Sequence, residues 1–172
     1  MIWKNTFPLN AACSSLNKIK LSLQDPEAVD LFQDILESGF YIRVKATGRS
    51  MWPIVKWGDI VILKKVKISS LKIGDLILFK TSQGNPILHR IVLILKTKTL
   101  FRTKGDALMV FDAPIEKGFV MGRVEKIEQI SSKGSIRSIT ITSGPWKMIN
   151  FVIALTSLFV GAVLRAFNWP IK

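Results

Sequence analysis

A chain of 172 residues, 48% hydrophobic and 22% charged, fits one domain with a buried core and excludes disordered, collagen-like and low-complexity proteins. The 25 Lys and Arg residues outnumber the 12 Asp and Glu residues, and the resulting net charge of +13 favours an anionic partner. One cysteine and one histidine cannot form an internal disulfide or a metal centre built from several such residues, so we expect neither a metal nor another cofactor.

Residues 1–39 are expected to form a leader followed by one short amphipathic helix. The first 17 residues contain no continuous apolar run, so we do not expect a signal peptide there. Asp25-Pro26-Glu27 favours a helix start, because Asp caps the first N–H groups and Pro fits the first helical position. Gly39 is expected to end this helix. In between, apolar residues recur at helical spacing: Ala28, Leu31, Phe32, Ile35 and Leu36.

Residues 40–143 are expected to form a β-rich domain, because apolar residues there follow a period of two. Turn signals separate the predicted strands, and the pairs Gly58-Asp59, Gly74-Asp75 and Gly105-Asp106 favour tight turns. Short strands without long helices between them are typical of an antiparallel, partly closed β-domain, so we expect a mainly β fold. The predicted strands are 40–47, 59–66, 75–80, 86–95, 99–103, 118–127 and 135–142.

Residues 146–169 are expected to form a C-terminal hydrophobic helix that is membrane-associated or transmembrane. No residue between 151 and 164 is charged, and Trp146 and Trp169 flank the run as tryptophans do at bilayer interfaces. The run is short for a span, so a buried helix or a helix lying in the interface is the alternative. This segment predicts a membrane localisation, on a side that the sequence does not specify. The basic surplus predicts contact with anionic membrane lipids.

Three stretches of the chain contain candidate catalytic residues. Ser50 lies in a turn that could present its hydroxyl beside backbone N–H groups able to hold an oxyanion. His89, the only histidine, lies inside an apolar strand, and an imidazole is the natural general base at neutral pH. Asp106 or Asp112 could orient that imidazole. Taken singly, each residue is more typical of a structural role; together they supply a nucleophile, a base and an acid.

Seven short segments occur in an order and spacing typical of one enzyme family. They are GRSMWP (48–53), KWGDIVIL (56–63), LKIGDLILF (71–79), ILHRIV (87–92), TKGDA (103–107), FDAPI (111–115) and VMGRV (120–124). On these segments, residues 40–127 resemble the signal peptidase I superfamily of serine endopeptidases, in particular its endoplasmic-reticulum and archaeal branch. The resemblance implies a membrane-tethered enzyme that cleaves signal or leader peptides after small residues. Its partner would be a precursor with an extended cleavage segment.

The resemblance also implies roles for individual residues. Ser50 matches the nucleophile and His89 the general base, a position that a lysine fills in the bacterial branch. Asp112 matches the acid of the family's triad, and Asp106 its other characteristic acid. The turn that shapes the nucleophile and the oxyanion site would contain Gly48, Arg49, Met51 and Pro53.

The sequence departs from the family at three points. Ala107 and Leu108 follow Gly105-Asp106 where the family typically has two asparagines. Gly48 stands where the family usually has a serine, so no hydroxyl side chain lies two residues before the nucleophile. We also expect no anchor of the family's usual N-terminal kind, since the hydrophobic segment of this sequence is C-terminal. Met51, Trp52 and Trp57 are each expected either to form an apolar lip at the bilayer interface or to pack in the core.

Two other functions are compatible with the sequence. A self-cleaving repressor of the SOS type belongs to the same broad superfamily. It would need a DNA-reading helix-turn-helix, whereas residues 1–39 predict only one helix. We therefore expect no nucleic-acid partner. The second alternative is a membrane adaptor that retains the fold as a non-catalytic binding module.

Overall fold

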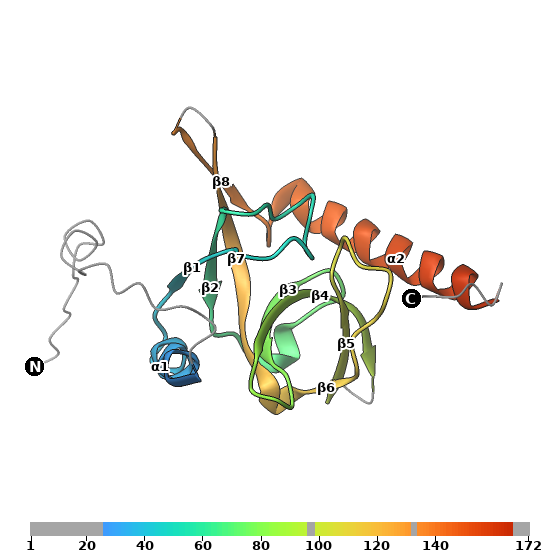
Figure 1. Cartoon of the computed structure of the whole chain (residues 1–172), viewed down its shortest axis with the longest axis horizontal. Helices are drawn as coiled ribbons and strands as arrows, with labels where there is room; N and C mark the ends of the chain where they lie inside the picture. Colours follow the sequence, from blue (N-terminus) through green and yellow to red (C-terminus); the bar gives the residue numbers. More distant parts are fainter. Residues whose placement is uncertain (1–25, 96–98, 132–133, 167–172) are drawn as a thin grey trace, which may run out of the picture.

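The computed structural model describes residues 26–95, 99–131 and 134–166 (Figure 1). In the two helices, side chains are described from residue 29 and up to residue 160. The predicted cap Asp25, the leader before it and the flanking Trp169 therefore lie outside the described residues.

The described chain begins and ends with a helix and is otherwise mainly β. Helix α1 is Pro26–Glu37, helix α2 is Gly144–Ala166, and two short 3₁₀ helices are η1 (Ile68–Ser70) and η3 (Lys117–Phe119). All seven predicted strands overlap observed strands. The strand β6 is not among the predicted ones, because its two residues are too few to show a period. The strands are β1 (Ile42–Lys45), β2 (Ile60–Lys64), β3 (Leu76–Lys80), β4 (Pro86–Leu95), β5 (Leu100–Lys104), β6 (Ile115–Glu116), β7 (Val120–Ile130) and β8 (Ile136–Thr140).

The strands form one antiparallel sheet in the order β1-β2-β7-β3-β4-β5-β6, with β8 paired to β7. Strand β7 joins the two halves of this sheet, because it pairs with β3 at its start, with β2 further on and with β8 at its end. The mainly antiparallel fold is confirmed. The sheet is open, since the strand order of the described residues ends at β1 on one side and at β6 on the other. Figure 1 shows how strongly it curls.

The core has two parts, and β3 contributes to both. Successive side chains of a strand point to opposite faces of the sheet. Leu76 and Leu78 accordingly pack in one apolar cluster, beneath α1 and β1, while Ile77 and Phe79 pack in the other, among β4, β5 and β6. All four side chains are buried, which explains why β3 reads as a continuous apolar run.

Helix α1 ends at the glycine that the sequence predicts. Gly39 has a φ of 84°, its N–H donates to the Leu36 carbonyl at 3.0 Å, and the Phe40 N–H donates to Ile35 at 3.3 Å. A glycine in the left-handed region is a common helix terminator because it carries no Cβ. The helix faces the core with Val29, Phe32 and Leu36.

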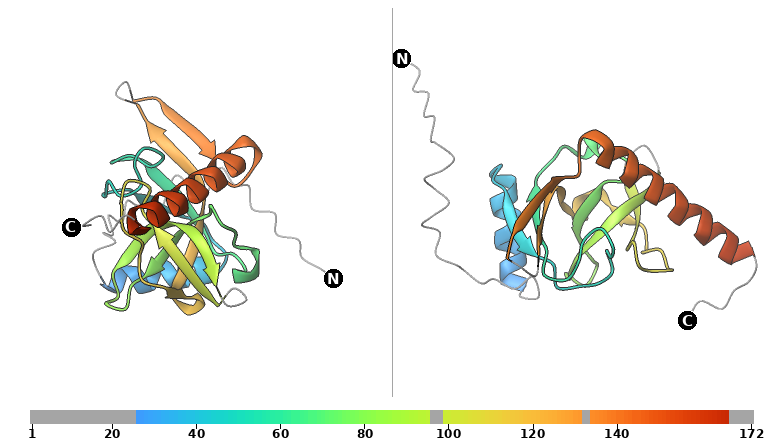
Figure 2. Two further views of the ribbon diagram at one scale, coloured as in Figure 1. Left: turned by 90° about the vertical axis from the view of Figure 1, so that its right-hand side faces the viewer. Right: turned by 90° about the horizontal axis from the view of Figure 1, so that it is seen from above.

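Helix α2 overlaps most of the predicted helix 146–169 and begins slightly earlier, at Gly144. It runs along the outside of the curled sheet (Figure 2). Among the described residues, no helix is both long and apolar enough to cross a bilayer. The membrane association of this segment stays a prediction.

Two of the predicted Gly-Asp turns have the same geometry. Gly58 and Gly74 have φ values of 90° and 99°. In each turn the following aspartate accepts a hydrogen bond, at 2.9 Å, from the backbone N–H three residues before it. The turns differ in their surroundings: a Cβ on Gly58 would meet nothing within 4 Å, whereas one on Gly74 would lie 2.9 Å from the Phe151 amide nitrogen. In the second turn, the backbone of α2 therefore packs directly against the glycine.

This difference predicts unequal costs for the same substitution. Gly58→Ala should lower the free energy of unfolding by about 1–2 kcal/mol, the cost of a left-handed alanine. Gly74→Ala should lower it by a further 1–3 kcal/mol or so, because α2 must also move. Urea denaturation of both variants tests this, and equal losses would show that α2 does not press on Gly74.

Candidate active site

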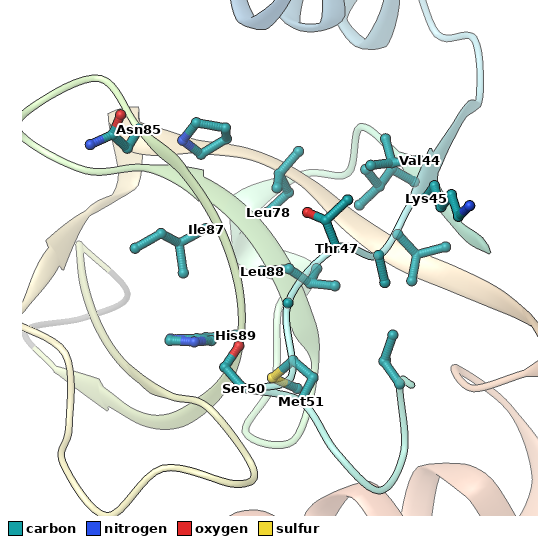
Figure 3. A pocket seen from close by; sticks show the side chains of 16 residues that line it. Val44, Lys45, Thr47, Ser50, Met51, Leu78, Asn85, Ile87, Leu88 and His89 are labelled. Atoms are coloured by element: carbon teal, nitrogen blue, oxygen red, sulfur yellow. The ribbon is translucent and has the colours of Figure 1, made fainter. Parts of the chain in front are cut away.

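The described chain brings Ser50 and His89 together at one cavity. The cavity has a volume of about 490 Å³ and is lined mainly by apolar residues of β1, β2, β3 and β4 and of the turn after β1. Ser50 lies in that turn and His89 on β4. Figure 3 shows the Ser50 hydroxyl beside the imidazole ring. Two of the predicted catalytic groups therefore share one site, although they are distant in sequence.

Strand β4 places His89 and Arg90 on opposite faces of the sheet. His89 is opposite Ile77 of β3, and Arg90 is opposite Leu76. Both side chains are buried, so each needs polar partners on its own side. The two aspartates of the site region supply those partners separately.

Asp112 is the carboxylate that contacts the imidazole. His89 Nδ1 lies 2.6 Å from Asp112 Oδ2, and the Thr103 hydroxyl donates to the same oxygen at 2.6 Å. The Asp112 N–H also donates to the Thr103 carbonyl at 3.0 Å, which ties this residue to β5. An ionised carboxylate only accepts hydrogen bonds, so Nδ1 carries the hydrogen and a neutral ring keeps its lone pair on Nε2. That is the tautomer a general base needs.

Gly105 closes the space between Nε2 and the serine turn. A Cβ on this residue would lie 2.9 Å from His89 Nε2 and 2.8 Å from the Ser50 carbonyl oxygen. The next residue but one, Ala107, donates its N–H to that same carbonyl at 2.8 Å. Glycine is needed here because any side chain would displace either the ring or the turn.

Asp106 lies on the other face of β4 and contacts Arg90. Its two carboxylate oxygens each accept a hydrogen bond of 2.7 Å from the guanidinium, and its side chain is only 3% exposed. Arg90 also donates, at 2.8 Å each, to the Gly74 carbonyl and to Asn150 Oδ1 of α2. The sequence left open which aspartate meets the imidazole; in the structure Asp112 does, and Asp106 neutralises a buried arginine. In the third Gly-Asp pair, the aspartate side chain is thus held by the buried Arg90.

The remaining predicted residues shape the turn to different degrees. Met51 is buried in the core beneath α1, whereas Trp52 and Trp57 are exposed, so the lip alternative stays open only for the tryptophans. Gly48 and Arg49 are exposed, and Pro53 follows a cis peptide bond. A Cβ on Gly48 would lie 4.0 Å from Ser50 Oγ, so the position has room for a side chain beside the hydroxyl.

Sequence reasoning missed the residues that support the site from behind. Thr103 and Arg90 were visible only as parts of motifs, and Asn150 only as a polar residue of the C-terminal helix. The available signal was an arginine inside an otherwise apolar strand, since a buried guanidinium requires an acid partner.

Comparisons of the chain with protein-family models, with curated proteins and with solved structures find no match.

The two aspartates should differ in what they do for stability. Asp106→Asn leaves the buried Arg90 without a counter-ion and should lower the free energy of unfolding by about 3–5 kcal/mol. Asp112→Asn is the matched control: the side chain is 22% exposed and an amide oxygen can still accept, so its cost should stay below about 2 kcal/mol. Urea denaturation measures both, and a larger loss for Asp112→Asn would contradict these assignments.

Proposed function

We propose that this protein is a membrane-associated serine endopeptidase of the signal peptidase I type. The observation that carries the proposal is the position of His89, whose Nδ1 contacts Asp112 at 2.6 Å while its ring lies beside Ser50 at the wall of an apolar cavity. A hydroxyl, an imidazole and a carboxylate in this sequence of contacts are the elements of nucleophilic acyl transfer.

In this mechanism Ser50 Oγ attacks the scissile carbonyl while His89 Nε2 takes its proton. Asp112 stabilises the resulting imidazolium and keeps the ring in its orientation. His89 then gives the proton to the leaving amine, and a water hydrolyses the acyl-enzyme by the same steps. Asp106 has no contact with the ring and acts by holding the segment that contains Gly105 against the serine turn.

The cavity that Ser50 and His89 share suits an extended peptide bound as an additional strand; we call it the groove. Within the described sheet, β1 is an edge strand that pairs with β2. Ala46, just after it, directs both backbone groups toward the β2 side, to residues 58 and 59. Backbone groups alternate in direction along an extended chain, so those of the flanking Lys45 and Thr47 point away from β2. Lys45 and Thr47 line the cavity, as do the small residues Ala46 and Gly48. Main-chain pairing would supply affinity, and the apolar cavity would select small side chains.

The membrane part of the proposal has separate support. The C-terminal segment is apolar between residues 151 and 164, and the chain has a net charge of +13. Anionic lipids attract such a basic domain. A non-catalytic adaptor with the same fold is the competing function, and the first experiment below separates the two.

Substitution of the three catalytic groups should abolish cleavage. Ser50→Ala and His89→Ala should each lower turnover on the order of 10⁴- to 10⁶-fold, and Asp112→Asn on the order of 10⁴-fold. The substrate is a proteome-derived peptide library, with cleavage sites read by mass spectrometry. Ser138→Ala on β8, an exposed serine that does not line the cavity, is the control and should keep wild-type activity.

Cleavage that survives Ser50→Ala would remove the mechanism. A wild-type protein that cleaves no peptide but binds one in the groove would favour the adaptor.

Gly48 provides a test in which catalytic activity should rise and not fall. Gly48→Ser would place a hydroxyl beside the nucleophile, where a second oxyanion donor could act. Since loss of one such donor costs about 10²- to 10³-fold in other enzymes, a gain of up to that size in kcat is expected. Gly48→Ala is the matched control and should give no gain. If both variants are slower than wild type, the oxyanion is not stabilised from this position.

A further inference from the structure

Helix α2 has a mixed inner face, where Trp146 packs against the core, and an apolar outer face. Asn150 and Ala154 are buried against the sheet, and Ser157 follows on the same side. On the opposite side an apolar stripe at helical spacing is exposed; we call it the outer face of α2, and it consists of Met148, Phe151, Val152, Leu155 and Phe159. A surface helix of a water-exposed domain carries charged and polar side chains on its exposed side. The outer face is therefore expected to bind an apolar partner.

The inner face is held by hydrogen bonds at two places. Arg90 donates to Asn150 Oδ1 at 2.8 Å, and Asn150 Nδ2 donates to the Ile141 carbonyl at 2.9 Å. Two turns further along, Lys104 Nζ donates to Ser157 Oγ at 3.4 Å. Burial lowers the pKa of Lys104, and the nearby charge of Asp106 opposes that shift. The helix is thus fixed along the sheet, and lifting it away would leave a buried guanidinium with an unsatisfied donor.

A cavity of about 620 Å³ continues the outer face toward the sheet. It lies between the 71–75 turn, Ile94 of β4 and the first turns of α2, and its lining is mainly apolar. The exposed Lys72 and Lys147 are both part of it. Asp75 also lines it; its carboxylate accepts the Lys72 N–H and lies 3.6 Å from Arg123 Nη1, a guanidinium that also pairs with Glu125 at 2.6 Å. Burial raises the pKa of Asp75, which weakens its opposition to an anion. An apolar cavity of this size with two cations suits an amphiphilic anion.

We propose that the outer face of α2 docks in the plane of an anionic lipid bilayer, with an acyl chain in this cavity and its phosphate between Lys72 and Lys147. This inference deepens the membrane part of the proposed function and is independent of the catalytic part. A helix with one apolar face and cationic flanks binds bilayer interfaces in this orientation. Because the inner face stays bound to Arg90 and Lys104, α2 lies along the membrane surface and does not cross it.

Charge favours a bilayer over a second copy of this chain as the occupant. In a two-fold dimer through the outer face, the lysines of both copies would approach one another, and each chain has a net charge of +13. Like charges across an interface oppose association, whereas anionic headgroups are attracted to the same groups.

Vesicle co-sedimentation of the full-length protein tests the proposed site. The probe is phosphatidylcholine vesicles with and without phosphatidylglycerol. Wild type should bind the anionic vesicles, and Lys72→Glu/Lys147→Glu should weaken that binding by at least about tenfold. The matched control is Lys56→Glu/Lys117→Glu, which has the same change in net charge. Lys56 holds the equivalent place in the Gly58-Asp59 turn, and both control lysines are exposed.

The apolar contribution is tested with a second matched pair. Phe159 is 70% exposed on the outer face, and Phe40, just after α1, is 66% exposed. Phe159→Gln should weaken vesicle binding and Phe40→Gln should not. Equal losses of vesicle binding by the two members of either matched pair of variants would overturn the proposed docking surface. A concentration-dependent dimer that Phe159→Gln abolishes, without vesicle binding by wild type, would assign the face to a second copy.

Depth measurements test the orientation of the helix. In a Cys13→Ser background, Met148→Cys and Phe159→Cys are each labelled with a fluorophore, and quenching by brominated lipids reports the depth of the label. A helix in the plane should place both probes at one shallow depth. A spanning helix would separate them by about 16 Å, at about 1.5 Å per residue, and would overturn the proposal.

Peptide cleavage in solution keeps the two proposals apart. The lysine and phenylalanine variants should cleave soluble peptides as wild type does, because none of these residues lies at the catalytic cavity. Loss of vesicle binding with intact cleavage would be a failure of docking alone. Vesicle binding without any cleavage would be a failure of the peptidase proposal alone.

Discussion

The buried guanidinium of Arg90 is the constraint on which the rest of the structure depends. A charge without access to water must be neutralised and fully hydrogen-bonded, or the fold loses several kcal/mol. Here Asp106, the Gly74 carbonyl and Asn150 together meet that requirement. These partners come from the β5–β6 loop, the turn before β3 and helix α2. One side chain of β4 thereby positions three segments that are far apart in sequence.

The catalytic arrangement follows from this network through the alternation of β4. His89 and Arg90 are neighbours in the chain but face opposite sides of the sheet, and the β5–β6 loop sends one aspartate to each side. Because Asp106 is held on one side, Gly105 is pressed against the serine turn and Asp112 reaches the imidazole on the other. The proposed chemistry therefore uses groups that are placed by interactions outside the catalytic cavity.

The same network explains why α2 can present an apolar surface. Most surface helices bind their domain through an apolar stripe alone, whereas α2 combines apolar packing by Trp146 and Ala154 with hydrogen bonds from Asn150 and Ser157 to polar partners beneath. The apolar residues of its outer face are left exposed. In the proposed function this places the peptidase groove on a domain held flat against anionic lipids, near substrates that emerge from the bilayer.

Local chemistry was sufficient to predict the seven longer strands, the end of α1 at Gly39 and two of the Gly-Asp turns, because periodicity and glycine torsions act between residues close in sequence. The motif segments also singled out Ser50, His89 and both aspartates. The tertiary structure decided the strand order, the burial of Met51, the partner of each aspartate and which side of α2 is exposed. Each of these depends on which distant segments pack together, and a carboxylate in a loop has no local signal of which face it will meet. Only folding of the loop around β4 assigns Asp112 to the imidazole and Asp106 to the guanidinium.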